Sequence, residues 1–465
     1  TMVDSKPVKE TQVCRFQTCY DVNIYPVSLL QASIIHKGGD NFISLRFEIE
    51  EGVNIANMGL DSIRLYLFGD SALTYTVYRL LNQQVEEIVF RDDSGGSIKN
   101  QGKLKMVGFG EDESVLQYDE HSYHAYRLLE EYFVFPEKFL FVDICGLKVL
   151  SALEVVSYFE VEIKLKTKAP AGLRLSSENF RLYCTPIVNI FPRDAEPIRL
   201  DHLNTKYRIM TDMVQPQNLE VYSVDKVEGI TLDMGQRRKY EPFYSFRHNT
   251  EEDDGVYYYL TREVSPGDAY WDTYISFVSS QKNINESVSL ELTCTNGNMA
   301  KKIAIGNICC PTENVPGFVK FSNITQPTPA LRPELGKGLE WKFISHLALN
   351  FLSITNTPGL CTLLEIYNTG NTKANRRRIA GIVGVDAVPE QILLHGVPIR
   401  GTHIHLKLNE KHFEDEGDVL LFSSVLNEFI SLYASINSFT RLTVSCTGSE
   451  VSIQWPAVTG KQEIM

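Results

Sequence analysis

Hydrophobic and polar residues alternate strictly in several segments of the first third of the chain. The clearest are residues 43–49 (ISLRFEI), 63–68 (IRLYLF) and 159–166 (FEVEIKLK). Alternation with a period of two residues is typical of antiparallel strands that have one buried face. The same kind of pattern returns at 219–224 (LEVYSV) and 288–294 (VSLELTC). We therefore expect β-sandwich-like units in both regions.

Other segments repeat their apolar residues with helical spacing. Two short ones, 71–81 and 122–133, lie between the first strands, and two more, 342–354 and 360–367, lie in the last part of the chain. Apolar residues three and four positions apart form one face of a helix. The fold class predicted is therefore α+β and predominantly β, with helical insertions between the strands.

Two breaks in composition predict domain boundaries. Residues 166–179 are rich in Lys, Pro, Gly and Ser, and residues 324–338 contain three prolines that disfavour a helix or a central strand. We predict a β-rich domain with short helices at 1–170, a second β-rich domain at 171–335, and a mixed α/β domain at 336–465.

A segment near the C-terminus predicts a helix, residues 419–436, that water contacts on neither side. Its apolar stripe runs from Phe422 to Ile436, and Asp418 is expected to cap it. A solvated helix usually carries Lys and Glu on its other face, but here that face is small and mostly uncharged. Its residues are candidates for a subunit interface: Ser423, Ser424, Asn427, Ser431 and Ser435.

Two alternatives remain for what covers this helix. It packs inside its own domain, or it contacts a partner subunit. The first alternative includes a predicted hairpin, because residues 442–446 and 451–455 alternate on either side of a turn at residues 447–450.

The charge and cysteine content exclude several classes of protein. The formal net charge is −13, and residues 376–378 are the one compact basic run, so a nucleic-acid partner is not expected. Nine cysteines form no Cys-x-x-Cys pair, which indicates a reducing compartment. The sequence shows no signal peptide and no run of 18 apolar residues, so no transmembrane segment is predicted.

One motif suggests an enzyme. Residues 65–73 (LYLFGDSAL) resemble the nucleophile block of Gly-Asp-Ser hydrolases, with Ser71 at the start of a helix. Such an enzyme needs a histidine base oriented by a carboxylate, and the Asp-x-x-His pair of those hydrolases does not occur in the sequence. Helix capping by Asp70 or Ser71 explains the same residues. A serine hydrolase is thus the alternative function, and we expect no enzymatic activity.

Potential ligand sites are equally weak, so no cofactor or metal is predicted. The two histidine pairs and the Cys309-Cys310 pair have no further ligand at a known spacing, and the acidic runs 250–255 and 413–418 do not match a calcium loop. Three consecutive tyrosines at 257–259 could stack on a carbohydrate, but in a strand they alternate between faces. The histidine pairs are His121 with His124, and His403 with His405.

Several blocks in order along the chain resemble the TssF family, baseplate subunits of the bacterial type VI secretion system. The central block is residues 183–209 (YCTPIVNIFPRDAEPIRLDHLNTKYRI). The resemblance covers nearly the whole chain, except that the family's N-terminal helical segment is absent from this sequence. The other blocks lie at 14–30, 220–229, 241–248, 292–298, 325–333, 338–354, 432–442 and 455–456.

The resemblance implies a function that the residues alone do not. It predicts a non-catalytic scaffold in the baseplate wedge, on which sheath and tube assemble. The implied partners are TssG, a second TssF copy, TssK, TssE and the VgrG hub. The implied location is the cytoplasmic side of the inner membrane of a Gram-negative bacterium, with membrane contact only through the assembled complex.

Overall fold

The computed structural model describes most of the chain, and every structural statement below concerns its described residues. These are residues 1–8, 12–99, 101–116, 118, 124–153, 155–201, 203–211, 219–231, 235–245, 256–265, 271–279, 285–332, 341, 344, 355–394, 396–431, 434–448 and 452–460. They form a mostly β structure with several helices, in which none of the antiparallel and mixed sheets closes into a barrel. The predicted fold class is confirmed.

Contacts divide the chain into two compact units. The first contains residues 1–18 and 187–330, and the second contains residues 19–186 and 331–465. The three domains predicted from the sequence stay a prediction, because this grouping is coarser. The sequence did not indicate that the last 135 residues belong to the same unit as residues 19–186.

The first unit contains a β-sandwich, as the alternating segments predict. Apolar side chains of two sheets, among them Val227, Leu290 and Ile275, form one core. One sheet has the order β13 (Phe191–Asp194), β21 (Glu286–Thr295), β16 (Glu220–Thr231) and β17 (Arg237–Lys239), with β14 (Ile198–Leu200) also paired to β21. The other has the order β15 (Tyr207–Arg208), β20 (Trp271–Ser279), β19 (Val256–Val264) and β18 (Glu241–Pro242).

A third, small sheet of this unit includes the N-terminal residues. Its order is β12 (Ile187–Val188), β2 (Arg15–Thr18), β1 (Met2–Ser5) and β22 (Ile308–Pro311). Val3, Cys14 and Phe16 pack with Ile303 and Ile308 in a separate apolar cluster. Because β1 pairs with both β2 and β22, residues about 300 positions apart share one sheet.

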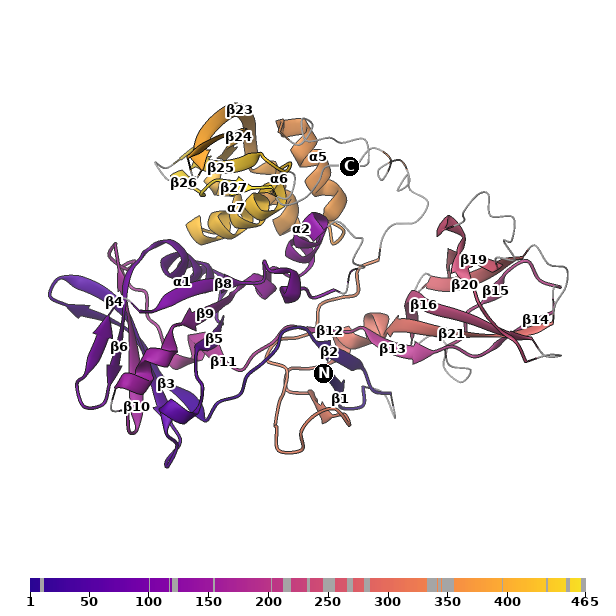
Figure 1. Ribbon diagram of the computed structural model, residues 1–465, viewed down its shortest axis with the longest axis horizontal. Coiled ribbons are helices and arrows are strands. Elements are labelled where there is room, and N and C mark those ends of the chain that lie inside the picture. The colour runs from indigo at the N-terminus through magenta and orange to yellow at the C-terminus, as the bar shows by residue number, and fades with distance from the viewer. Residues whose placement is uncertain are drawn as a thin grey trace. The chain divides into compact units, whose positions relative to one another are not determined.

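The second unit begins with two antiparallel sheets that carry the strict alternation (Figure 1). The first is β3 (Val27–Lys37), β4 (Asp40–Ile49), β10 (Tyr158–Leu165), β6 (Val85–Asp92) and β7 (Ser97–Lys99), and the second is β11 (Phe180–Leu182), β5 (Ser62–Leu67), β9 (Phe141–Cys145) and β8 (Lys103–Val107). Phe47 and Phe159 face each other in register, with ring centroids 5.0 Å apart. Helix α1 (Ser71–Gln83) contacts β5, β6 and β8, strands of both sheets.

The C-terminal sheet of the second unit contains a parallel pair. Its order is β23 (Ile382–Leu394), β24 (Val397–Leu408), β25 (Phe439–Cys446) and β26 (Ser452–Gln454), with β27 (Val458–Thr459) also paired to β25. β24 and β25 run parallel, so the chain must cross over between them, and helix α7 (Glu416–Ser431) makes that crossover. The predicted hairpin is confirmed, since Val444 pairs with Ile453.

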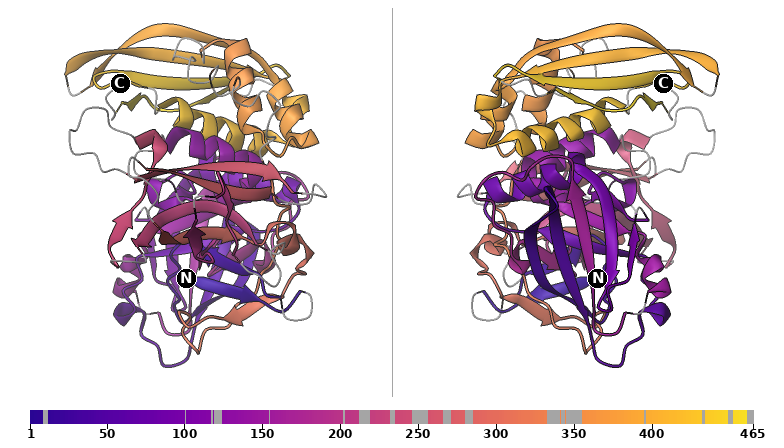
Figure 2. Two further views of the ribbon diagram at one scale, coloured as in Figure 1. Left: turned by 90° about the vertical axis from the view of Figure 1, so that its right-hand side faces the viewer. Right: turned by 90° about the vertical axis from the view of Figure 1, so that its left-hand side faces the viewer.

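Helix α7 is covered on both sides. It packs against β25 and also against α1 and α2 (His124–Val134), so it lies between the C-terminal sheet and two helices of the chain's first half (Figure 2). Of the two alternatives left by the sequence, the observed packing is therefore inside the chain itself. No helix in the described residues is long and apolar enough to cross a membrane.

The ends of α7 correct two details of the prediction. The described part of α7 runs to Ser431, and residues 434–436 are not helical. Ile436 is 44% exposed and does not continue the apolar stripe. The helix is capped by Asp415 and not by Asp418, since the Asp415 carboxylate accepts the amide of Asp418 at 2.9 Å. The side chain of Asp418 is buried in the interior. The helix predicted at 360–367 is α5 (Thr357–Tyr367), whereas the segment 342–354 lies mostly outside the described residues.

The approach of α7 to α1 predicts that Gly417 tolerates no side chain. A Cβ there would lie 2.0 Å from the carbonyl oxygen of Tyr75. We expect Gly417→Ala to lower the free energy of unfolding by about 1–3 kcal/mol, although Ala is normally the better helix former. Urea unfolding measures the change. Gly317→Ala, with nothing within 4 Å of the added Cβ, is the control, and a stabilised Gly417→Ala protein would contradict the close packing.

Candidate functional site

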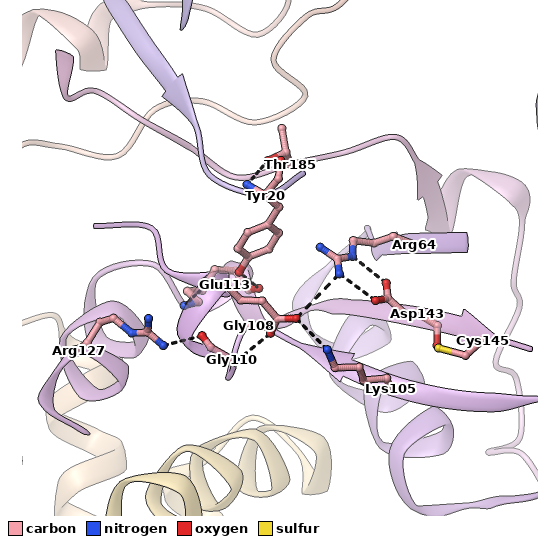
Figure 3. A network of polar contacts seen from close by, with 11 residues as sticks. Tyr20, Arg64, Lys105, Gly108, Gly110, Glu113, Arg127, Asp143, Cys145 and Thr185 are labelled. Atoms are coloured by element: carbon pink, nitrogen blue, oxygen red, sulfur yellow. Dashed lines mark hydrogen bonds and ion pairs between the residues drawn. The ribbon is translucent and has the colours of Figure 1, made fainter. Parts of the chain in front are cut away.

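A network of polar contacts fixes the loop of residues 108–116, which joins β8 to α2 (Figure 3). At its centre is Glu113, which is only 4% exposed. One carboxylate oxygen accepts the amides of Gly108 at 2.6 Å and Gly110 at 3.0 Å, and the other accepts the Lys105 ammonium at 3.3 Å. Burial alone would raise the pKa of Glu113, but these hydrogen bonds outweigh it and lower that pKa.

The same network reaches the strands of the neighbouring sheet. Arg64 on β5 and Asp143 on β9 are directly opposite each other and form a two-pronged ion pair of 2.7 and 2.8 Å. The Arg64 guanidinium also lies over the ring of Tyr20, 5.5 Å from its centroid. The hydroxyl of Tyr20 donates to the carbonyl of Lys138 at 3.1 Å. Strands and loop are thereby joined through side chains as well as through the sheet.

A second set of buried charges ties this loop to α2. Lys138 is fully buried, and its ammonium donates to the Glu113 carbonyl at 3.0 Å and to the Glu131 carboxylate of α2. Glu131 in turn accepts the amide of Val115 at 2.7 Å, and Arg127 donates to the Gly110 carbonyl at 2.7 Å. Burial lowers the pKa of the Lys138 ammonium, and the Glu131 charge opposes that effect. These buried charged side chains therefore hold backbone groups of the 108–116 loop against α2.

A third polar group, the Arg378 cluster, joins four helices. Arg378 of α6 (Lys373–Ala380) forms an ion pair with Asp418 of α7, with N–O distances of 3.0 and 3.1 Å. Its guanidinium also donates to the hydroxyl of Tyr75 on α1 at 3.3 Å and lies 5.9 Å from the ring centroid of Tyr132 on α2. Asn375 completes the cluster, accepting from Arg378 and donating to the carbonyl of Phe133 at 2.8 Å.

Burial and the Arg378 ion pair act in opposite directions on the pKa of Asp418. Burial raises this pKa and outweighs the nearby guanidinium. Burial also opposes the charge of Arg378, but the Asp418 carboxylate beside it keeps the pKa of Arg378 above its ordinary value. Asp418 has no exposed surface and Arg378 is 5% exposed. A charge so deeply buried is tolerated only with its partner in place.

Aromatic rings continue this contact along α7. The Phe422 ring lies 5.8 Å from Tyr132, and the Phe429 ring lies 5.6 Å from Tyr126 on the same helix α2. Tyr126 also stacks on Tyr367 of α5, at 5.2 Å between centroids and an angle of 12°. These rings and the Arg378 cluster form one joint, which we call the α7 joint, between the C-terminal sheet and helices α1 and α2.

The candidate interface residues of the sequence lie mostly within the α7 joint. Four of the five are buried by the chain itself, and Ser435 is half-buried beyond the helix end. Ser423 donates to the carbonyl of Val419 at 2.6 Å, which satisfies its hydroxyl inside the helix. The buried four are Ser423, Ser424, Asn427 and Ser431. In the structure these small side chains are packed against other parts of the same chain. Whether a partner subunit also contacts them stays a prediction.

The candidate hydrolase residues occupy an ordinary helix start. Asp70 caps α1 by accepting the amide of Leu73 at 2.8 Å, and Ser71 is the exposed first residue of that helix. The capping role predicted for Asp70 is confirmed.

The histidine pair on β24 does share one face. His403 and His405 have ring centroids 4.0 Å apart, and His403 contacts Thr443 at 2.8 Å and Glu390 at 3.6 Å. Burial and the neighbouring His405 lower the pKa of His403. Glu390 also forms an ion pair with Arg441, with an N–O distance of 2.5 Å. Among the described residues there is no group of three or more His, Cys, Asp and Glu side chains placed to hold a metal.

The remaining candidates have no common site. All nine cysteines carry free thiols, including Cys309 and Cys310. Tyr258 is buried while Tyr259 is 46% exposed, so the three tyrosines alternate as predicted. His121, the side chain of His124 and the acidic run 250–255 lie outside the described residues.

Sequence reasoning missed the residues that hold the joints. No motif in the sequence marks Glu113, Lys138 or Arg378, and the sequence predicts Asp418 only as a helix cap. Ile379 is a signal that α6 has a buried face, but nothing in the run 376–378 distinguishes the buried Arg378 from its exposed neighbours. Glu113 and Lys138 lack any such signal, because backbone groups are their main partners.

These features define a class of structural protein in which buried charges and helices hold several sheets together. Residues 1–462 match the family "Type VI secretion system, TssF", and the chain belongs to this family. It is 25% identical over 498 residues to the type VI secretion system component TssF1 of Pseudomonas aeruginosa, covering 97% of this chain and 79% of that protein.

Two solved structures share the fold. One is a chain of the TssK-TssF-TssG baseplate subcomplex of the type VI secretion system, determined by cryo-electron microscopy. It matches with a TM-score of 0.83 and 26% identity over 99% of this chain and 87% of that chain. The other belongs to a baseplate complex of the type VI secretion system, and its TM-score of 0.63 at 21% identity, over 100% of this chain and 81% of that chain, shows the fold alone.

The Arg378–Asp418 pair predicts a large cost for removing one partner. Arg378→Met leaves Asp418 buried and unpaired, so the free energy of unfolding should fall by about 3–5 kcal/mol in urea titrations. The double variant Arg378→Met/Asp418→Leu should recover part of this loss, because no charge then remains buried. Arg376→Met on the exposed side of α6 is the control, expected within about 0.5 kcal/mol of wild type. Equal stability of Arg378→Met and wild type would refute the role of the pair.

The lowered pKa of Glu113 predicts a stability term that depends on pH. The ionised form is favoured by folding, so its contribution is present above the unfolded pKa near 4.5 and is lost as the pH falls through the lower folded pKa. Glu113→Gln should therefore lose about 1.5–3 kcal/mol at pH 7 and progressively less below about pH 4.5. Thermal unfolding across this range tests it. Exposed Glu111→Gln is the control, and a penalty that stays constant with pH would count against this assignment.

Proposed function

We propose that this chain is a non-catalytic structural component of the type VI secretion baseplate that assembles with TssG and TssK. The observation that carries the proposal is its likeness, over 99% of its length, to a chain of the TssK-TssF-TssG subcomplex. A protein of this kind works by holding surfaces in fixed positions, and the α7 joint and the 108–116 network supply that rigidity.

The distribution of polar groups supports a structural role. The buried charges of the 108–116 network and the Arg378 cluster are engaged with backbone groups or with each other. A catalytic acid or base must instead face a space that substrate enters. We extend the proposal to a second TssF copy, TssE and the VgrG hub as further partners, and to the cytoplasmic face of an inner-membrane-docked baseplate. Sheath and tube would assemble on this wedge.

Co-expression tests the proposal directly. The chain should co-purify with TssG and TssK from the same gene cluster as one early peak in size-exclusion chromatography, whereas alone it should elute later, at the volume expected for its own size. Ser71→Ala should assemble like wild type, because the proposal gives that hydroxyl no chemistry.

Two results would count against the scaffold function. One is a folded chain that elutes separately from TssG and TssK at moderate salt. The other is a hydrolytic activity that disappears in Ser71→Ala while assembly is absent, which would favour the hydrolase alternative.

A further inference from the structure

Four cations form an exposed surface on α6 and the short helix η9 (Glu410–His412), which we call the α6 patch. Its members are Lys373, Arg376, Arg377 and Lys411, and all four are exposed. Residues three and four positions apart lie on neighbouring parts of a helix surface, which places the three cations of α6 together. Contacts between α6 and η9 bring Lys411 to the same place.

The patch is held in position by contacts below it. Arg378 turns inward to Asp418, so α6 is oriented with Arg376 and Arg377 outward. The guanidinium of Arg377 donates to the carbonyl of Lys411, and the imidazole of His412 contacts the carbonyl of Arg377 at 3.0 Å. The two elements are thus fastened to each other, and a ligand of the patch does not have to order them first.

Three carboxylates at the start of α7 are engaged elsewhere. Asp418 pairs with Arg378, Glu416 forms an ion pair with Arg79, and Asp415 accepts the hydroxyl of Thr76 at 3.0 Å. Within the described part of the chain, Lys373, Arg376 and Lys411 have no ion-pair partner. Two carboxylates, Glu410 of η9 and the exposed Glu414, lie close to Lys411 in the chain. In a chain with 58 acidic and 45 basic residues, four cations beside these two carboxylates still leave a local excess of positive charge.

We propose that the α6 patch is a docking surface for an acidic segment of a partner protein in the assembly. The proposal rests on the proposed function and names the chemistry of one contact. A helix of eight residues spans about 12 Å, which suits a short run of Asp and Glu. An extended anionic surface such as DNA or a membrane would also face the rest of this chain, whose net charge of −13 repels it. Charge complementarity therefore favours a short acidic peptide segment.

Charge reversal of the patch tests this contact. The triple variant Lys373→Glu/Arg376→Glu/Lys411→Glu keeps Arg377, whose side chain fastens η9. Its affinity for an immobilised TssK–TssG complex should fall at least about tenfold at about 150 mM salt, because like charges then meet at the contact. Wild-type affinity should also fall more steeply with salt than that of the variant. Far-ultraviolet circular dichroism and the unfolding midpoint show whether each variant is folded. If the triple variant is not folded, the single variant Arg376→Glu is tested in its place.

A matched control carries the same change in net charge at other exposed lysines. Lys99→Glu/Lys103→Glu/Lys302→Glu should bind like wild type. If the patch variant and this control both bind like wild type, the docking proposal is wrong while the assembly function stands.

A labelled decaglutamate peptide separates the two proposals. If wild type does not bind TssK–TssG at all, the proposed function fails, and the patch is judged by fluorescence anisotropy with this peptide. Peptide binding that is lost in the patch variant and kept in the control supports the patch. No binding, or tighter binding of duplex DNA or phosphatidylglycerol vesicles than of the peptide, overturns it.

Discussion

The burial of α7 on both sides is the constraint on which the second unit depends. Because α7 connects the parallel strands β24 and β25, the sheet covers one face of the helix, and α1 and α2 cover the other. Small residues at Ser423 and Gly417 let the helices approach closely, and Gly417 reaches the backbone of α1. Removing water from both faces leaves no place for an unpaired charge, which is why Asp418 requires Arg378.

Local structure could be predicted from the sequence wherever one face of an element meets the core. The strands around Phe47 and Phe159 and helices α1, α2 and α5 follow their hydrophobic period because each has a polar side. Helix α7 shows the limit of this reasoning. Its uncharged second face indicated that something covers it, but a covering helix about 290 residues earlier leaves no trace in local spacing. The parallel pairing of β24 with β25 is invisible for the same reason.

The polar joints were harder to predict than the core, since their partners are mainly backbone groups. Glu113, Glu131 and Lys138 read as ordinary charged residues, and only the folded chain brings amides and carbonyls of the 108–116 loop to them. Replacing a buried ion pair by apolar groups is often neutral or stabilising in other proteins, so the presence of such a pair is weak evidence for stability. What the structure shows here is that these charges hold backbone groups of the loop. Glu131 and Arg127 tie residues 110–115 to α2, the helix on which α7 packs.

The order of the second unit along the chain has a consequence for its synthesis. Helices α1 and α2 emerge from the ribosome long before their cover, because α7 begins about 280 residues after α2 ends. At the usual rate of translation that interval is on the order of tens of seconds. During that time the helix that covers Tyr75, Tyr132 and their neighbours has not been made, and residues 187–330 of the first unit are made in between. Exposed apolar surface of this kind makes partly folded chains prone to aggregation, and here it stays uncovered until α7 is made.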